Sequence, residues 1–248
     1  MSADNQKEGI GDLLKTAFFA LLLALVIRTF LFEPFNIPSG SMVPNLLVGD
    51  YLFVSKYSYG YSKHSFPLSL GGFEGRVASD NLPQRGDVAV FKLPLNTSID
   101  YIKRVIGLPG DTLQVINGHL YINKKSVPRE MMGFKEYKDG FGRTFEAVEY
   151  TETLPNDVIH LIQELGDNHP LDNTEEFTVP EGHYFMMGDN RDNSQDSRVM
   201  DHVGFVPLEN FVGHARFIFF STKGTARIYE IWKWPFTIRY DRLFQKIH

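Results

Sequence analysis

A serine-containing turn is the first segment of this sequence whose residue types could do chemistry. It reads PSGSMVP at residues 38–44 and follows a hydrophobic N-terminal run. Prolines fix the backbone φ angle, and glycine lets the backbone approach another group closely. Such a turn can hold one hydroxyl in a defined pose beside free backbone N–H groups, as a serine nucleophile requires. The motif alone is more typical of an ordinary loop, so the prediction depends on finding a base.

A lysine among apolar neighbours is the candidate base. In the segment 100–106, DYIKRVI, strand alternation puts Lys103 on one face and Arg104 on the other. Burial disfavours the charged amine, and the adjacent Arg104 would act in the same direction. A fall in the lysine pKa from about 10.4 to about 7–8 would let Lys103 accept a proton from a serine hydroxyl. The alternative, which this segment alone favours, is a strand lysine pointing to water.

The third unusual segment is GDNRDNSQDSR at residues 188–198, a dense run of turn-forming and hydrogen-bonding side chains. Alternating Asp and Asn residues suggest a calcium loop, but the central glycine and the glutamate at the twelfth position are both missing. The other interpretation is a hydrogen-bonded scaffold. In that scaffold Ser194 orients a lysine amine, and Asp196 pairs with Arg198 to hold the loop.

Composition narrows the possible functions of the 248-residue chain. It has no cysteine, which excludes disulfides, thiolate metal sites and cysteine catalysis. Residues 129–181 hold 13 acidic and 4 basic side chains, whereas residues 221–248 hold 6 basic and 2 acidic ones together with Trp232 and Trp234. A basic, aromatic tail suits a lipid surface, although two ordinary solvated faces are the alternative. No basic stripe or nucleic-acid motif occurs, so we expect no nucleic-acid partner.

The N-terminal hydrophobic run predicts a membrane anchor at residues 13–32, behind a short tail at residues 1–12. As a helix, 20 residues span roughly 30 Å, one hydrocarbon thickness. Lys15 and Arg28 lie near its two ends, where their side chains can reach the interface. A cleaved signal peptide is the alternative, but acidic residues outnumber basic ones before the run and no small-x-small site follows it. A retained anchor is therefore favoured.

Strand signals dominate the rest of the chain. Short segments rich in β-branched and aromatic residues, bounded by turn formers, occur at 50–55, 87–92, 100–106, 112–116, 120–123, 183–187 and 215–221. Asn117-Gly118 predicts a tight hairpin, and residues 158–165 predict one short helix. The aromatic-rich residues 57–80 form either an interfacial ribbon or a hairpin packed on the core. The sequence thus predicts a mostly β architecture.

The segments around Ser41, Lys103 and residues 188–198, in this order behind an anchor, closely resemble those of bacterial type I signal peptidases. These are membrane proteases that use a Ser/Lys dyad. The matches are PSGSMVPNL at 38–46, GDYLFV at 49–54, RGDVAVFKLP with YIKRVIGLPGD at 85–111, and GDNRDNSQDSR at 188–198. The resemblance implies a β-rich catalytic core carrying an inserted β-rich subdomain. We assign the core to residues 33–111 and 180–220, the acidic insert to 112–179 and a basic aromatic C-terminal segment to 221–248.

The resemblance also implies a role for each matching residue. These are Ser41 as nucleophile, Lys103 as general base, Ser194 as the residue that orients the base, the Ser41 N–H and the Ser39 hydroxyl as the oxyanion hole, Asp196 and Arg198 as structural support, and Ile37 and Ile102 as walls of the substrate pockets. It implies neither a metal nor a cofactor. Asn45 departs from the usual pattern, in which a threonine is commoner, and residues 199–202 also differ from many members.

The implied activity is that of a membrane-bound serine endopeptidase. It would remove N-terminal signal peptides from secreted preproteins after small residues at −1 and −3. Its partners would be those preproteins and membrane lipid. By analogy it crosses the bacterial inner membrane once, with residues 1–12 in the cytoplasm and the catalytic domain on the periplasmic face. Two alternatives remain: a Ser-His-Asp hydrolase using His202 or His214, and a non-catalytic, membrane-tethered module that binds peptides or assists assembly.

Overall fold

A computed structural model describes residues 10–66, 75–78, 81–138, 143–166, 169–223 and 229–247. Its two α-helices are α1 (Ile10–Phe30) and α2 (Trp234–Thr237). The strands are β1 (Phe32–Asn36), β2 (Asp50–Ser55), β3 (Val88–Leu93), β4 (Asn96–Gly107), β5 (Thr112–Ile116), β6 (His119–Ile122), β7 (Lys125–Ser126), β8 (Arg129–Lys138), β9 (Thr144–Thr153), β10 (Ile159–Glu164), β11 (Phe177–Thr178), β12 (His183–Met187), β13 (Val206–Pro207) and β14 (Phe211–Ser221). The chain is mostly β, which confirms the predicted fold class.

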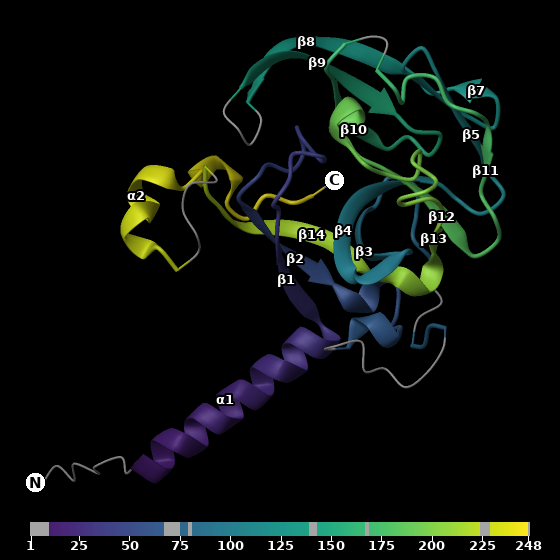
Figure 1. Ribbon diagram of the computed structural model, residues 1–248. Helices are drawn as coiled ribbons and strands as arrows, with labels where there is room; N and C mark the ends of the chain where they lie inside the picture. Colours follow the sequence, from purple (N-terminus) through teal and green to yellow (C-terminus); the bar gives the residue numbers. More distant parts are fainter. Residues whose placement is uncertain are drawn as a thin grey trace, which may run out of the picture.

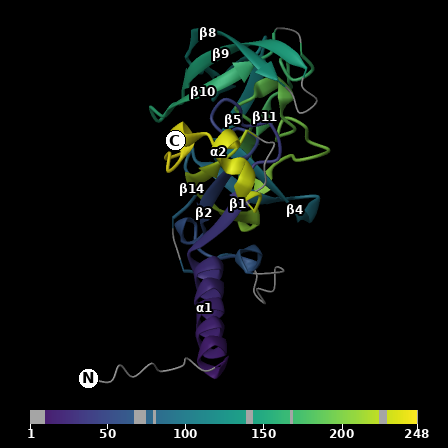
Figure 2. The same ribbon diagram turned by 90° about the vertical axis from the view of Figure 1, so that its left-hand side faces the viewer.

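Helix α1 projects away from the body of the protein (Figures 1 and 2). Its 21 residues are apolar enough to cross a membrane, and none of them is buried against the rest of the chain. The helix begins three residues before the predicted anchor and ends two residues earlier. Its end is fixed to the body because the Tyr61 hydroxyl donates to the Phe30 carbonyl over 2.6 Å, and the buried Lys56 amine binds Glu33 over 2.7 Å. These two contacts attach the C-terminal end of α1 to the body of the protein.

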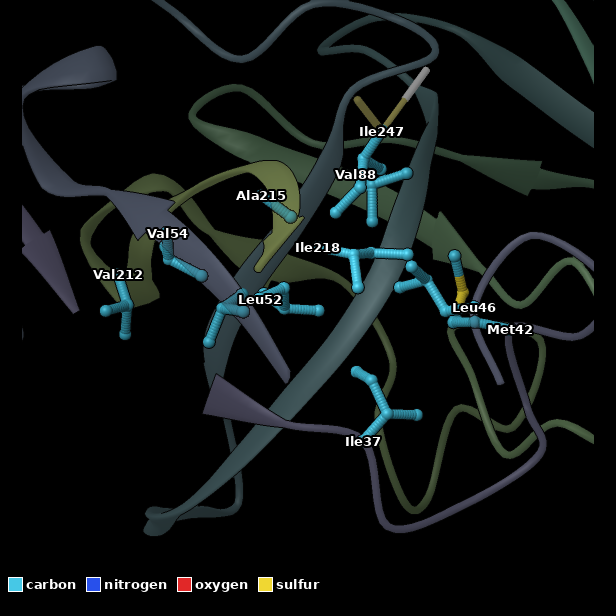
Figure 3. Packing of buried hydrophobic residues seen from close by; sticks show 11 residues of the cluster. Ile37, Met42, Leu46, Leu52, Val54, Val88, Val212, Ala215, Ile218 and Ile247 are labelled. Carbon is cyan, nitrogen blue, oxygen red and sulfur yellow. The ribbon is translucent and has the colours of Figure 1, made fainter. Parts of the chain in front are cut away.

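The main sheet has seven strands in the order β1-β2-β14-β3-β4-β12-β13, with antiparallel pairing throughout. Alternate residues of β2 and β3 point into one apolar cluster, in which Leu52 and Val54 are fully buried. Met42 and Leu46, from the loop that joins β1 to β2, enter the same cluster (Figure 3). The core thus anchors the serine-containing turn through the side chains beside it.

Two smaller sheets are built from the residues of the predicted insert. Their strand orders are β10-β9-β8 and β11-β5-β6-β7. The sheet of β8, β9 and β10 lies at the end of the molecule opposite to α1 (Figures 1 and 2). The Asn117-Gly118 hairpin is confirmed: it joins β5 to β6 with φ angles of 50° and 75°. The proposed boundaries of the insert remain a prediction.

The prediction of a helix at residues 158–165 is wrong, because this segment forms strand β10. The sequence VIHLIQEL is apolar at both helical and strand spacings, so its periodicity alone is ambiguous. Pairing with β9 decides the outcome: Ile159 through Glu164 align with Thr153 through Val148. The paired strand buries Ile162 completely and leaves Ile159 exposed. Non-local hydrogen bonding therefore overrides the local pattern.

The C-terminal segment is tied to the core through its basic residues. The Arg242 guanidinium binds the fully buried Asp50 carboxylate over 2.6 Å, and Arg239 lies 3.6 Å from the same group. Trp232 and Phe236 remain exposed, at 67% and 82%. Some of the basic charge predicted to face lipid is therefore used internally, and Trp234 also packs on the core, with its ring centroid 4.8 Å from that of Phe220. Lipid contact by this segment, and by the part of residues 57–80 that the structure describes, stays a prediction; Leu68, Leu70 and Phe73 lie outside the described residues.

Replacing Asp50 tests this attachment. Asp50→Ala would leave Arg242 without its buried carboxylate and the Ser221 hydroxyl without its acceptor at 2.6 Å. Breaking a buried, hydrogen-bonded pair costs about 3–5 kcal/mol. We expect a loss of that size in the free energy of unfolding, measured by denaturant titration in detergent. The exposed Glu175→Ala control should change it by less than about 0.5 kcal/mol. An equal, small change in both variants would contradict this view of the C-terminal segment.

Candidate active site

Ser41 and Lys103 meet in the structure although 62 residues separate them in the sequence. Ser41 lies in the turn after β1, and Lys103 lies on β4. The Lys103 amine donates to the Ser41 hydroxyl over 2.7 Å and to the Ile102 carbonyl over 3.0 Å. Both side chains are largely removed from solvent, with 8% and 4% of each residue exposed. A hydroxyl and an amine in direct contact can exchange a proton without an intervening water.

Burial lowers the pKa of Lys103 from its usual value to about 8. Desolvation is the main cause, the Asp196 and Asp189 carboxylates oppose it, and the Arg198 guanidinium reinforces it. From the sequence we expected Arg104 to lower the pKa of Lys103 further. Instead Arg104 lies on the opposite face of β4, where it binds Asp189 through two contacts of 2.8 Å. A pKa near 8 leaves an appreciable neutral fraction of the amine near neutral pH.

The turn that carries Ser41 is held from both sides. On one side Met42 and Leu46 are fully buried in the core cluster (Figure 3). On the other side the Asn190 backbone N–H donates to the Ser41 carbonyl over 3.1 Å. The Ser39 hydroxyl lies 3.5 Å from the Ser41 hydroxyl, close enough to act on the same reacting group. The nucleophile candidate is therefore rigidly placed.

The loop at residues 188–198 is a hydrogen-bonded scaffold. Asp196 accepts two 2.9 Å bonds from the Arg198 guanidinium, as the sequence predicted for this pair. The Gly188 N–H also donates to Asp196 over 3.0 Å. A Cβ atom on Gly188 would lie 2.2 Å from the Ser194 hydroxyl and 2.6 Å from the Ser41 carbonyl oxygen. Glycine is thus required where the loop and the turn make their close approach.

Ser194 lines the same cavity as Ser41 and Lys103, a space of about 770 Å³. Its hydroxyl is buried and does not bind the Lys103 amine here, but it lies close enough to the Asp196 carboxylate to help lower the pKa of that group. The role of Ser194 in orienting the base is therefore not seen as a contact, and it stays a prediction. The hydroxyl lies beside Gly188, because a Cβ atom on that glycine would come within 2.2 Å of it.

Ile37 and Ile102 line one small cavity of about 210 Å³ beside the dyad. Pro38, Tyr101 and Ile102 border this cavity and the larger one that holds Ser41, so the two spaces adjoin. Ile37 is almost completely buried and packs in the core cluster, while Ile102 is half-buried against it. Most of the lining residues of the small cavity are apolar, although Asn36 and Asp100 also border it, and its volume suits a small side chain.

A buried charge network behind the site was not predicted from the sequence. Arg104 and Asp189, the first a predicted neighbour of Lys103 and the second without a predicted role, form an ion pair with 0% and 1% side-chain exposure. The second pair joins Arg191 to Glu152 over 2.9 Å. The signal for Asp189 and Arg191 was their position in the predicted scaffold. Nothing in the sequence marks Glu152, which comes from β9 in the insert.

The two histidines considered as alternative bases lie elsewhere. The His202 ring nitrogen is 3.0 Å from the Tyr101 hydroxyl. His214 stacks on Tyr59 and lies 3.9 Å from Asp87, and desolvation lowers its pKa. Neither ring makes a hydrogen bond to Ser41 within the described part of the chain. The arrangement favours the lysine as the partner of the serine.

Comparisons with known proteins identify the family of this chain. Residues 10–220 match the family model described as "Signal peptidase, peptidase S26". The chain is 42% identical to signal peptidase I of Rickettsia typhi over 93% of this chain and 91% of that protein. It is 39% identical to signal peptidase I of Rickettsia conorii, over 100% and 98%.

A crystal structure of a signal peptidase I from Enterococcus faecalis is 30% identical, with a TM-score of 0.33, over 55% of this chain and 98% of that one. The family match spans most of the chain, and the Rickettsia relatives span nearly all of it. The chain therefore belongs to the signal peptidase family, peptidase S26, and is a serine peptidase.

Proposed function

We propose that this peptidase removes signal peptides with a Ser41–Lys103 dyad. The family supports signal-peptide removal in general. The observation that carries the proposed chemistry is the 2.7 Å contact between the Lys103 amine and the Ser41 hydroxyl in a buried site. Low solvent exposure keeps the amine partly neutral, so that it can act as a base.

In the proposed mechanism the neutral Lys103 amine takes the Ser41 proton as Ser41 Oγ bonds to the scissile carbonyl carbon. The Ser41 N–H and the Ser39 hydroxyl stabilise the resulting oxyanion. The C–N bond then breaks, and the leaving amine receives the proton from Lys103. Water attacks the remaining ester, again with Lys103 as base, and this step regenerates Ser41 and releases the signal peptide. Asp196 and Arg198 hold the surrounding loop in place, and Ser194 would orient the Lys103 amine.

The substrate would bind as an extended strand. β1 is an edge strand of the main sheet, so its free edge can pair with a peptide without demanding a sequence. The small cavity at Ile37 and Ile102 would then restrict the residues at −1 and −3 to small side chains. Backbone pairing would supply affinity and the small cavity would supply selectivity.

The membrane would be part of the recognition. Helix α1 would cross it once, with the catalytic domain on the periplasmic face of the inner membrane and residues 1–12 in the cytoplasm. The joint formed by Tyr61 and Lys56 at the end of α1 supports a fixed distance between the bilayer and the site. A preprotein anchored by its own apolar segment would present its cleavage site at the same depth. Membrane lipid and the preprotein are the proposed partners, and nucleic acid is not.

Substitutions in the dyad distinguish this proposal from its alternatives. Ser41→Ala and Lys103→Met should each lower the rate of preprotein cleavage by at least about 10³-fold, because each removes a reacting group. His202→Ala and His214→Ala should keep cleavage within about threefold. The assay is mass spectrometry of the products from the full chain in detergent, which also gives the cut position. Cleavage by Lys103→Met would rule out the dyad, and no cleavage by the unaltered chain would favour a binding module.

The pH dependence of kcat/KM provides an independent test of the base. Only the neutral Lys103 amine can accept a proton, so activity should rise with pH and level off above the pKa of about 8. A histidine base would give a midpoint near about 6.5, and an exposed lysine one near about 10.4. Initial rates on a signal-peptide substrate between pH 5 and about 10.5 would locate the midpoint. A midpoint at the histidine value would exclude Lys103 as the base.

A further inference from the structure

The carbonyl of Gly40 is held by a side chain that the proposed mechanism does not use. The Asn190 side-chain amide donates to the Gly40 oxygen over 3.0 Å, and the Asn190 backbone N–H donates to the Ser41 oxygen. The Val43 N–H also donates to the Gly40 oxygen, at a longer 3.2 Å. Asn190 thus donates hydrogen bonds to the carbonyls of the two consecutive peptide groups that flank Ser41.

Gly40 and Ser41 share one planar peptide group, and this links Asn190 to the oxyanion hole. In a trans peptide the C=O and the N–H point in opposite directions and rotate together. When a hydrogen bond directs the Gly40 carbonyl toward Asn190, the Ser41 N–H therefore points away from Asn190. Ser41 lines the 770 Å³ cavity, whereas Asn190 does not line it and has 0% exposure. Within the described part of the chain, the Ser41 N–H has no acceptor.

The orientation of the Asn190 amide is fixed by chemistry. The Gly40 oxygen can only accept, so the amide must present its nitrogen rather than its oxygen. The neighbouring residue is immobilised as well, because Asp189 pairs with Arg104 and its carbonyl accepts from the Gln163 N–H over 2.8 Å. The donor that holds Gly40 therefore sits on a rigid support, and little rotation of the peptide is available.

We propose that Asn190 is a positioning residue that aims the Ser41 N–H at the oxyanion before the substrate arrives. The inference rests on the proposed function, since it assumes that this N–H stabilises the oxyanion. Preorganised donors stabilise charge that develops in the transition state more than they stabilise the bound substrate. Losing the Asn190 amide should consequently lower kcat and leave KM nearly unchanged.

The test compares Asn190→Ala with Asn210→Ala in the full chain in detergent. Asn210 is a matched control because it is also buried and its amide also donates to a carbonyl, that of Lys92, over 2.9 Å. Three quantities are measured: kcat and KM for a signal-peptide substrate, the affinity of a cleavage-site peptide aldehyde, and the affinity of the same peptide as a non-cleavable amide. Ser41 adds to the aldehyde to form an oxyanion, whereas the amide reports ground-state binding.

For Asn190→Ala we expect kcat and aldehyde affinity to fall together by about 10²-fold, the scale of losing one oxyanion donor. KM and amide affinity should stay within about twofold, and the pH midpoint should not move, because the dyad contact is untouched. Asn190→Leu fills the same space without a donor and should behave alike. Asn210→Ala should leave all the kinetic and binding values within about twofold, and thermal melting reports the loss of stability in each variant.

Several results would overturn the inference. One is a kcat for Asn190→Ala no lower than that of Asn210→Ala, and another is an equal loss of aldehyde and amide affinity, which indicates a general structural role. The dyad variants separate this failure from failure of the proposed function. If Ser41→Ala and Lys103→Met are inactive while Asn190→Ala keeps its kcat, only the role of Asn190 is wrong. If either dyad variant still cleaves, the proposed mechanism itself is wrong.

Discussion

The buried ion pair between Arg104 and Asp189 is the interaction on which the site depends. It joins the strand that carries Lys103 to the loop that carries Asn190 and Ser194. Arg104 directly follows Lys103, and Asp189 directly precedes Asn190. Strand alternation explains why the pairing does not consume Lys103: the two basic residues point to opposite faces of β4. Removing one partner of such a pair leaves a buried, uncompensated charge, so the two segments are strongly held together.

Pairing of the surrounding charges also sets the chemistry of Lys103. The Asp196 and Asp189 carboxylates raise the pKa of Lys103, but each is paired with an arginine, Asp196 with Arg198 and Asp189 with Arg104, and their effect is smaller than that of burial. Desolvation then dominates. Lowering the pKa from 10.5 to about 8 costs the folded protein about 3 kcal/mol. The cost is fully present below the folded pKa, where folded and unfolded chains both hold the proton, and it vanishes above the unfolded value.

Local patterns in the sequence predicted the parts of the site that lie within single segments. Alternation along residues 100–106 placed Lys103 and Arg104 correctly on opposite faces, and the turn at Ser41 was recognisable from its prolines and glycine. The partners across the fold were not predictable in this way. Glu152 pairs with Arg191 and Asn45 reaches Leu161 only because β9 and β10 pack behind the scaffold. The error at residues 158–165 has the same origin, since strand pairing decided it.

Strand β10, which lies within the predicted insert, contacts the residues around the site directly. Asn45, which follows the serine turn, donates to the Leu161 carbonyl over 2.7 Å and to Asp189 over 2.8 Å. Gln163, also on β10, donates to the Asp189 carbonyl and forms an isolated bridge with Asn190. Asparagine can make both Asn45 bonds because its amide has two N–H donors, whereas a threonine hydroxyl has one. The departure at Asn45 thus adds a bond between the serine turn and strand β10, so that β10, the scaffold loop and the turn are joined by hydrogen bonds.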